Sequence, residues 1–177
     1  MDLSKFKDSP LPNLKIKILY GFWLFISNYF FLTNIPFPSK FKILLLKVFG
    51  AKIGKKVVIK PYVKIKFPWN LHINDYVWLG ENVWIDNLSL VSIGSNCCIS
   101  QNSIILTGNH NYKKDTFDLM TSPITIEEEV WIGANCFISN GITIQKKSVI
   151  LVSSTLTKST EPNSIYQGNP AIKIKNR

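Results

Sequence analysis

Histidine and cysteine are scarce in this sequence, and their scarcity excludes several kinds of site. The 177 residues include two histidines, His72 and His110, and three cysteines, Cys97, Cys98 and Cys136. None of them has the spacing of a metal site, and an odd number of cysteines argues against a disulfide framework. We therefore expect no metal, buried free thiols and a cytoplasmic protein, because a reduced cysteine packs as a small apolar residue.

Acidic residues are absent from a long part of the chain. Between Ser9 and Asn74 there is no Asp or Glu but there are eleven lysines, and the formal net charge of the whole chain is +10. This imbalance favours anionic partners, namely phosphates, nucleotides or an acidic membrane surface. Nucleic acid is not expected as a partner, because no binding motif is present and many of the lysines follow the repeats described next.

Most of the chain also lacks the period of a helix or of an alternating strand. Instead, an aliphatic residue recurs at every sixth position, in groups of three: Ile53, Ile59, Ile65; Ile73, Leu79, Ile85; Ile93, Ile99, Ile105; Ile126, Ile132, Ile138; Ile144, Ile150, Leu156. A period of six fits a solenoid in which each hexad is one short strand and a turn. The pattern predicts five triangular coils with the aliphatic side chains stacked inside.

Two further features accompany the hexads. Four positions after the aliphatic residue lies a compact residue, such as Val57 or Ser148, which we expect to fill a tight corner. In several hexads the next residue is glycine: Gly54, Gly80, Gly94 and Gly133. Extra residues interrupt the series at Leu71–His72, Val91–Ser92 and 111–125, and we expect them to loop out at corners.

The front third of the chain differs from the repeats. Residues 1–12 are polar and predict a loose arm, whereas residues 13–33 are apolar and aromatic. Polar residues within that apolar run favour a buried or interfacial helix over a membrane span. Ser39 is expected to cap a second helix that ends at Gly50. The chain thus divides into a helical cap segment (1–50), a repeat domain (51–158) and a carboxy-terminal tail (159–177).

Three stretches resemble a known family of enzymes. They are VSIGSNCCISQNSIILTGNHNY, PITIEEEVWIGANCFISNGITI and QGNPA. They are similar to the acetyl-CoA-dependent O-acetyltransferases of the maltose and galactoside group, and more closely to WcaF-like acetyltransferases, which share the PWNL segment at 68–71. The resemblance implies an all-β fold, a left-handed parallel β-helix with an N-terminal helical segment, although the general crossover rule favours the right hand. It also implies a homotrimer with acetyl-CoA bound between neighbouring subunits.

The resemblance assigns His110, in the TGNH motif, as the catalytic base. An imidazole suits this task, because it can take a proton from a sugar hydroxyl and pass it to a leaving thiolate near neutral pH. A backbone N–H of a neighbouring coil is expected to stabilise the oxyanion. No acyl-enzyme is required, so the cysteines need not react. His72 is expected to be an exposed corner residue without a role.

The same resemblance assigns the coenzyme contacts. The matching residues are Trp131, Gly133, Ala134, Val152, Thr157, Lys158, Gly168, Asn169, Pro170, Lys173 and Lys175. Two departures bear on them: Ile172 stands where a basic residue is usual, and Leu151–Val152–Ser153 replaces a run of small residues. The first is expected to shift phosphate contact by one residue towards the later lysines or to weaken it, and the second is expected to crowd the coenzyme.

Asp86 and Asn87 are the candidates for holding the acceptor, which is expected to be a sugar or a lipid-linked sugar in surface polysaccharide biosynthesis. Asn87 is slightly favoured, since WcaF-like proteins also have an asparagine there. Two alternatives remain at this point: a non-catalytic scaffold and an acyltransferase that uses another acyl donor. A third, a γ-type carbonic anhydrase, needs three histidines for each zinc site, which this chain cannot supply. The lysine-rich front third predicts peripheral contact with the inner face of an anionic membrane.

Overall fold

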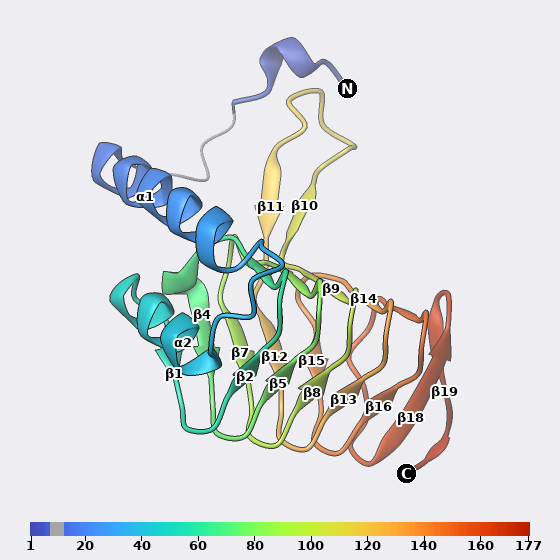
Figure 1. Ribbon diagram of the computed structural model, residues 1–177. Coiled ribbons are helices and arrows are strands. Elements are labelled where there is room, and N and C mark those ends of the chain that lie inside the picture. Colours follow the sequence, from blue (N-terminus) through green and yellow to red (C-terminus); the bar gives the residue numbers. More distant parts are fainter. Residues whose placement is uncertain (8–12) are drawn as a thin grey trace.

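A parallel β-solenoid of triangular coils forms the body of the molecule (Figure 1). The structure is a computed structural model that describes residues 1–7 and 13–177. Sheet A contains β1 (Lys52–Ile53), β4 (Leu71–Ile73), β7 (Val91–Ile93), β12 (Ile124–Ile126) and β15 (Thr143–Ile144). Sheet B contains β2 (Val58–Ile59), β5 (Trp78–Leu79), β8 (Cys98–Ile99), β13 (Trp131–Ile132), β16 (Val149–Ile150), β18 (Ser164–Gly168) and β19 (Ala171–Asn176). Sheet C contains β3 (Lys64–Ile65), β6 (Trp84–Asp86), β9 (Ile104–Leu106), β14 (Phe137–Ile138) and β17 (Thr155–Leu156).

The hexad aliphatic residues form the interior, as predicted. All of them are buried, and equivalents in successive coils are direct neighbours, for example Ile65, Ile85 and Ile105 in sheet C. Burying one such side chain stabilises the fold by about 1.5–3 kcal/mol. The compact residues, such as Val57 and Ser148, are buried as well. The predicted parallel β-helix is therefore confirmed.

The glycines that follow the aliphatic residues allow the coils to stack closely. A Cβ atom on Gly133 would lie 2.8 Å from the backbone nitrogen of Val152 in the next coil. Gly54, Gly80 and Gly94 face the next coil at similarly short distances. A larger residue at these positions would push two coils apart.

The short insertions lie at different residues from those predicted. Leu71–His72 and Val91–Ser92 are strand residues of β4 and β7, and His72 lies on sheet A rather than at a corner. The extra length lies just before these strands, in the 3-10 turn η2 (Pro68–Asn70) and in residues 87–90. Leu71 and Val91 are buried, so burial keeps these residues in the sheet and moves the turns outward.

The long insertion is a hairpin, and the tail is more regular than expected. β10 (Gly108–His110) and β11 (Leu119–Thr121) pair antiparallel and project from the solenoid (Figure 1). In the tail, β18 pairs parallel with β16 and begins a sixth coil beyond the five predicted. β19 folds back antiparallel on β18 and ends the sheet.

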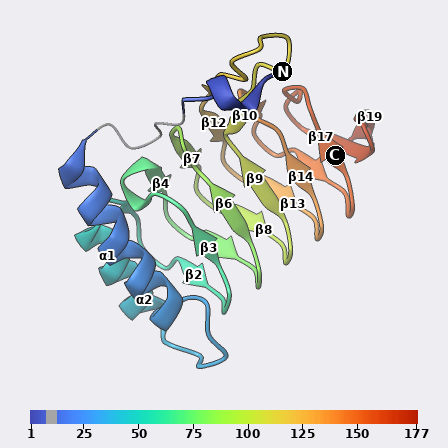
Figure 2. The ribbon, with the colours of Figure 1, turned by 90° about the horizontal axis from the view of Figure 1, so that it is seen from above.

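Two helices cover the first end of the solenoid, α1 (Leu14–Phe30) and α2 (Ser39–Val48) (Figure 2). The buried Trp23 of α1 donates its indole N–H to the carbonyl of Ile65, 2.8 Å away. Ser39 does not cap its helix, because its hydroxyl instead accepts the N–H of Ile59 at 3.0 Å. Lys42 is fully buried and donates to the carbonyl of Lys60 at 3.1 Å; burial lowers the pKa of its ammonium group.

These contacts satisfy edge-strand groups of the first coil that would otherwise lack partners. Among the described residues, no helix has the length and apolar character needed to cross a membrane.

The expectation of a loose amino-terminal arm is wrong for residues 1–7. Leu3–Lys5 form a 3-10 turn, η1, and the N–H of Asp2 donates to the carbonyl of Asp115 at 2.8 Å. The arm thus lies against the β10–β11 hairpin. The rest of that predicted arm, residues 8–12, lies outside the described residues.

Candidate active site

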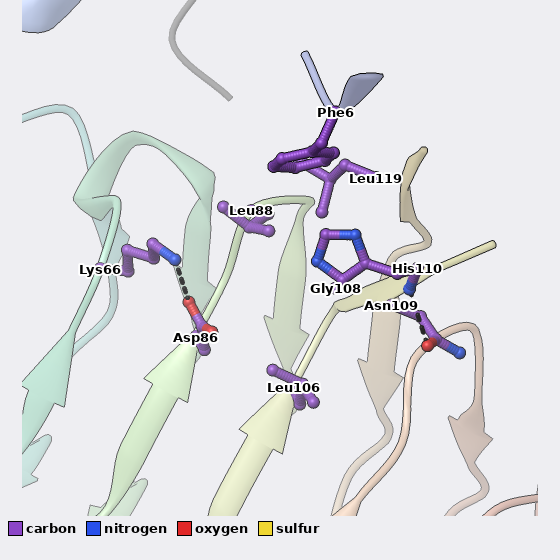
Figure 3. Close-up of a pocket in the computed structure, with 9 residues that line it drawn as sticks. All are labelled: Phe6, Lys66, Asp86, Leu88, Leu106, Gly108, Asn109, His110 and Leu119. Atoms are coloured by element: carbon purple, nitrogen blue, oxygen red, sulfur yellow. Dashed lines mark hydrogen bonds and ion pairs between the residues drawn. The ribbon is translucent and has the colours of Figure 1, made fainter. Parts of the chain in front are cut away.

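His110 borders a cavity of about 380 Å³ where sheet C ends and the hairpin begins (Figure 3). Three parts of the chain build it: the ends of β3, β6 and β9, the hairpin, and the amino-terminal arm. Its lining residues are Phe6, Lys66, Asp86, Leu88, Leu106, Gly108, Asn109, His110 and Leu119.

A column of residues from three successive coils forms one side of the cavity. Lys66, Asp86 and Leu106 each follow the inward aliphatic residue of sheet C, and Asp86 is the register partner of Leu106. The Lys66 ammonium lies 3.0 Å from the Asp86 carboxylate. The solenoid therefore places a nearly buried acid and its counter-ion in the cavity that His110 borders.

The His110 ring is held in one orientation. Its Nδ1 lies 3.0 Å from the carbonyl oxygen of Phe117, and its ring stacks on the Phe117 ring at 4.3 Å with an interplanar angle of 3°. A carbonyl only accepts, so Nδ1 carries the proton in this contact, and the neutral ring has Nε2 as its acceptor. The backbone N–H of His110 donates to Asn109 Oδ1 at 2.8 Å. This arrangement suits a general base acting through Nε2.

Asn87 does not line the cavity beside Asp86. It is fully buried, and its side-chain amide accepts the N–H of Phe67 at 2.9 Å and donates to the carbonyls of Phe67 and Asn70. These bonds tie down the η2 turn. Of the two predicted acceptor residues, the structure brings only Asp86 together with His110.

The predicted coenzyme residues do not enter this cavity, and most follow another edge of the solenoid. Trp131 is exposed on sheet B, where its indole N–H donates to Ser100 Oγ at 3.0 Å. The carbonyl of Ala134 accepts the N–H of Ser153 at 2.9 Å, and Gly168 N–H donates to Ser154 Oγ at 3.2 Å. Ala134, Val152 and the turn at Gly168, Asn169 and Pro170 thus follow the edge between sheets B and C.

The other predicted coenzyme residues are placed differently. Gly133 is buried, and its N–H and carbonyl bond Ile150 and Ser103, so it serves coil stacking. Thr157 and Lys158 follow β17, at the corner where β9 leads to His110, two coils further along. Lys173 pairs with Glu161 at 2.7 Å, and Lys175 and Ile172 are exposed.

The cysteines are free, and their surroundings suit packing rather than nucleophilic chemistry. Cys97 and Cys136 are buried as predicted, whereas Cys98 is half-buried. Burial raises the pKa of all three thiols, that of Cys97 to about 11. Because the thiolate is the reactive form, these residues are poor nucleophiles at neutral pH.

Lys66 and Phe6 are among the cavity residues that sequence reasoning missed. Lys66 is detectable from the 20-residue distance between Ile65 and Ile85, which places Lys66 beside Asp86 in the next coil. Phe6 carries no comparable signal, because it lies in a short polar arm outside any repeat.

Solved structures with this architecture define the class of protein. A hexapeptide-repeat acetyltransferase from Vibrio cholerae, in complex with acetyl coenzyme A, is 23% identical and superposes with a TM-score of 0.84 over 93% of this chain and 90% of its own. A maltose O-acetyltransferase from Clostridium difficile is 24% identical, with a TM-score of 0.76 over 93% of this chain and 89% of its own. The chain thus has the hexapeptide-repeat acetyltransferase fold.

Sequence relatives narrow the class to a family. The chain is 40% identical over 138 residues to the colanic acid biosynthesis acetyltransferase WcaF of Escherichia coli (strain K12), covering 78% of this chain and 76% of that protein. It is 32% identical to a galactoside O-acetyltransferase of the same organism, over 74% of this chain and 66% of that protein. No protein-family model matches. The chain belongs to the WcaF-like family of hexapeptide-repeat acetyltransferases, and the predicted class of enzyme, an acetyl-CoA-dependent acetyltransferase, is confirmed.

Proposed function

We propose that this enzyme transfers an acetyl group from acetyl-CoA to a sugar hydroxyl in surface polysaccharide biosynthesis, with His110 as general base. The observation that carries this proposal is the fixed His110 ring beside a cavity that also holds Asp86. The coenzyme supplies the acetyl group as a thioester. Nε2 of His110 takes the proton of the attacking hydroxyl and returns it to the departing thiolate, while Asp86 accepts a hydrogen bond from the sugar.

The test replaces His110 by alanine. His110→Ala should lower kcat about 10²–10⁴-fold while acetyl-CoA still binds. Release of free coenzyme A with methyl β-D-galactopyranoside as acceptor measures the rate, and calorimetry measures coenzyme binding. His72→Ala is the matched control, because it removes the other histidine from the outer face of sheet A. Full activity in His110→Ala would refute the proposal.

We also propose that the active site is completed between subunits of a homotrimer. Trp131 lies on sheet B, whereas His110 lies at the corner between sheets C and A, so the two belong to different sides of one prism. A neighbouring subunit that presents the edge with Trp131 and Ala134 brings the coenzyme to His110. This arrangement supports threefold closure, in which each subunit contributes His110 to one site and the coenzyme-binding edge to another.

Mixed subunits test this arrangement. His110→Ala and Trp131→Ala should each be nearly inactive alone. A random mixture of equal amounts of the two should regain about a quarter of the wild-type rate, because about three quarters of the trimers are mixed and one of the three interfaces in each mixed trimer is intact. The subunits must be co-expressed or refolded together so that they exchange. No recovery in trimers shown to be mixed would place both residues in a site within one chain.

We further propose that the enzyme attaches peripherally to an anionic membrane through α1. One face of α1 exposes large apolar side chains at helical spacing: Leu14, Ile18, Phe22, Phe25 and Tyr29. We call this row the apolar stripe. Lys15 and Lys17 begin the same helix, and the segment from 9 to 74 has eleven lysines without one acidic residue. An apolar face beside a cationic surface is suited to the interface of an anionic bilayer.

Vesicle flotation tests the membrane proposal. The enzyme should float with phosphatidylglycerol vesicles, and binding should weaken as salt rises, because surface charges are screened. Phe22→Ser with Phe25→Ser should abolish flotation, whereas Tyr112→Ser, which removes an equally exposed aromatic residue from the hairpin, should not. Unchanged flotation of the double variant would reject this face, and self-association lost in that variant would show that another copy covers it.

A further inference from the structure

The amino-terminal arm closes over the cavity of His110 although it is distant in the sequence. The Asp2–Asp115 backbone bond holds it on the hairpin, and Phe6 then points into the cavity (Figure 3). The Phe6 ring meets the His110 ring edge-on, with centroids 5.4 Å apart at 64°. It meets the Phe117 ring in the same way, at 6.2 Å and 66°. A segment outside the repeats therefore supplies one wall of the site.

The cavity has two chemically different sides. The ion pair of Lys66 and Asp86 and the His110 ring offer hydrogen-bonding groups, whereas Phe6 and Leu88 offer apolar surface. A pyranose has the same division, because its hydroxyl groups project from the ring edge while its C–H groups form an apolar face. Sites with apolar walls and a few fixed polar groups orient a ligand by this kind of match. An aromatic ring is the natural partner of the C–H face.

We propose that Phe6 is a specificity-determining residue of the acceptor site. Its ring packs against the apolar face of an acceptor pyranose and turns the hydroxyl edge towards His110 and Asp86. The inference rests on the proposed sugar acceptor and adds a role for the arm that acetyl transfer by His110 does not require. It selects a ring-shaped acceptor with one apolar face over a flexible alcohol of the same size.

Replacing Phe6 leaves the folded core intact, which makes the proposal testable. Phe6 does not belong to the buried core of the solenoid, and its described ring partners are His110 and Phe117. Leu3, in the same arm, is exposed and does not line the cavity. Leu3→Ala is therefore a matched control for any general effect of changing the arm.

Steady-state kinetics separate a role in acceptor binding from a structural one. With methyl β-D-galactopyranoside as the probe, Phe6→Ala should raise the acceptor KM about 10-fold, a loss within the range of an aromatic contact. The KM for acetyl-CoA should stay unchanged, and Phe6→Trp should restore acceptor binding. Acetylation of n-hexanol should respond much less to the change. An unchanged acceptor KM in Phe6→Ala, or equal losses for the pyranoside and the alcohol, would overturn the proposal.

A chemical probe tests the closure without any acceptor. Diethyl pyrocarbonate modifies histidine rings, and the two histidines can be followed separately by mass spectrometry. Phe6→Ala should speed modification of His110 several-fold and leave His72 unchanged, while Leu3→Ala changes neither. Equal rates at His110 in wild type and Phe6→Ala would mean that the arm does not cover the ring, and the inference would fall. The proposed function fails separately, if His110→Ala keeps full activity or if the wild type acetylates no methyl pyranoside.

Discussion

Trp23 provides a sharp test of how the solenoid closes its first end. It is fully buried, donates its indole N–H to the carbonyl of Ile65 at 2.8 Å, and packs against Phe31 and Phe49 with ring centroids 5.3 and 5.2 Å away. The acceptor carbonyl belongs to β3, the first strand of sheet C, which has no earlier strand to pair with. One side chain thus serves as both a core residue and the missing hydrogen-bond donor.

Two substitutions separate these contributions. Trp23→Phe keeps most of the packing but leaves a buried carbonyl without a donor, so it should cost about 1–3 kcal/mol of unfolding free energy. Trp23→Ala also removes the ring, and large-to-small changes of this kind cost about 3–5 kcal/mol. A total stability of about 5–15 kcal/mol is usual, so the alanine substitution should remove a large part of that margin.

Urea unfolding at one fixed protein concentration measures both effects, because the proposed trimer would couple stability to concentration. Trp78→Phe is the control, since Trp78 is exposed on sheet B and its change should stay within about 0.5 kcal/mol. If Trp23→Phe were as stable as wild type, the hydrogen bond to Ile65 would contribute nothing. The helices would then cap the end of the solenoid through packing alone.

Other predictions follow from the coils. Gly133→Ala should destabilise the fold by about 1–3 kcal/mol in urea, because its Cβ would press on the Val152 nitrogen at 2.8 Å. The pKa of Cys97 is raised to about 11, so stability should be lost from about pH 9 to 11 as the unfolded thiol ionises first; Cys97→Ala should remove that component. Cys98→Ser should keep full acetyl transfer, because the proposed direct transfer from acetyl-CoA to the acceptor requires no acyl-enzyme.

The repeat domain could be predicted closely because each hexad by itself encodes one strand and one turn of the fold. An aliphatic residue at every sixth position is directly visible, and its burial in stacked coils requires no long-range information. The same reliance on local pattern explains why insertions were wrongly predicted at Leu71–His72 and Val91–Ser92. Counting hexads shows how many residues are extra, but packing of Leu71 and Val91 decides which of them stay in the sheet.

The candidate site was only partly visible from the sequence. His110 could be found by resemblance, and Asp86 was one of two candidates in the second coil; the cavity contains both. The resemblance slightly favoured Asn87 over Asp86, and only the structure shows that the Asn87 amide is used by Phe67 and Asn70. Phe6 depends on a contact between the arm and the hairpin, more than a hundred residues apart in sequence, which no local pattern records.

The insertions show how a regular solenoid acquires a site. Residues 67–70, 87–90 and 107–123 all lie between a strand of sheet C and the next strand of sheet A, at one corner of three successive coils. Extra backbone is tolerated there because it lies outside the coils and leaves the aliphatic interior unchanged. Since all three insertions share a corner, they are adjacent in space, and residues of the second and third line the cavity of His110. The lining of the cavity can therefore change through the second and third insertions and the arm, while the aliphatic interior of the coils stays the same.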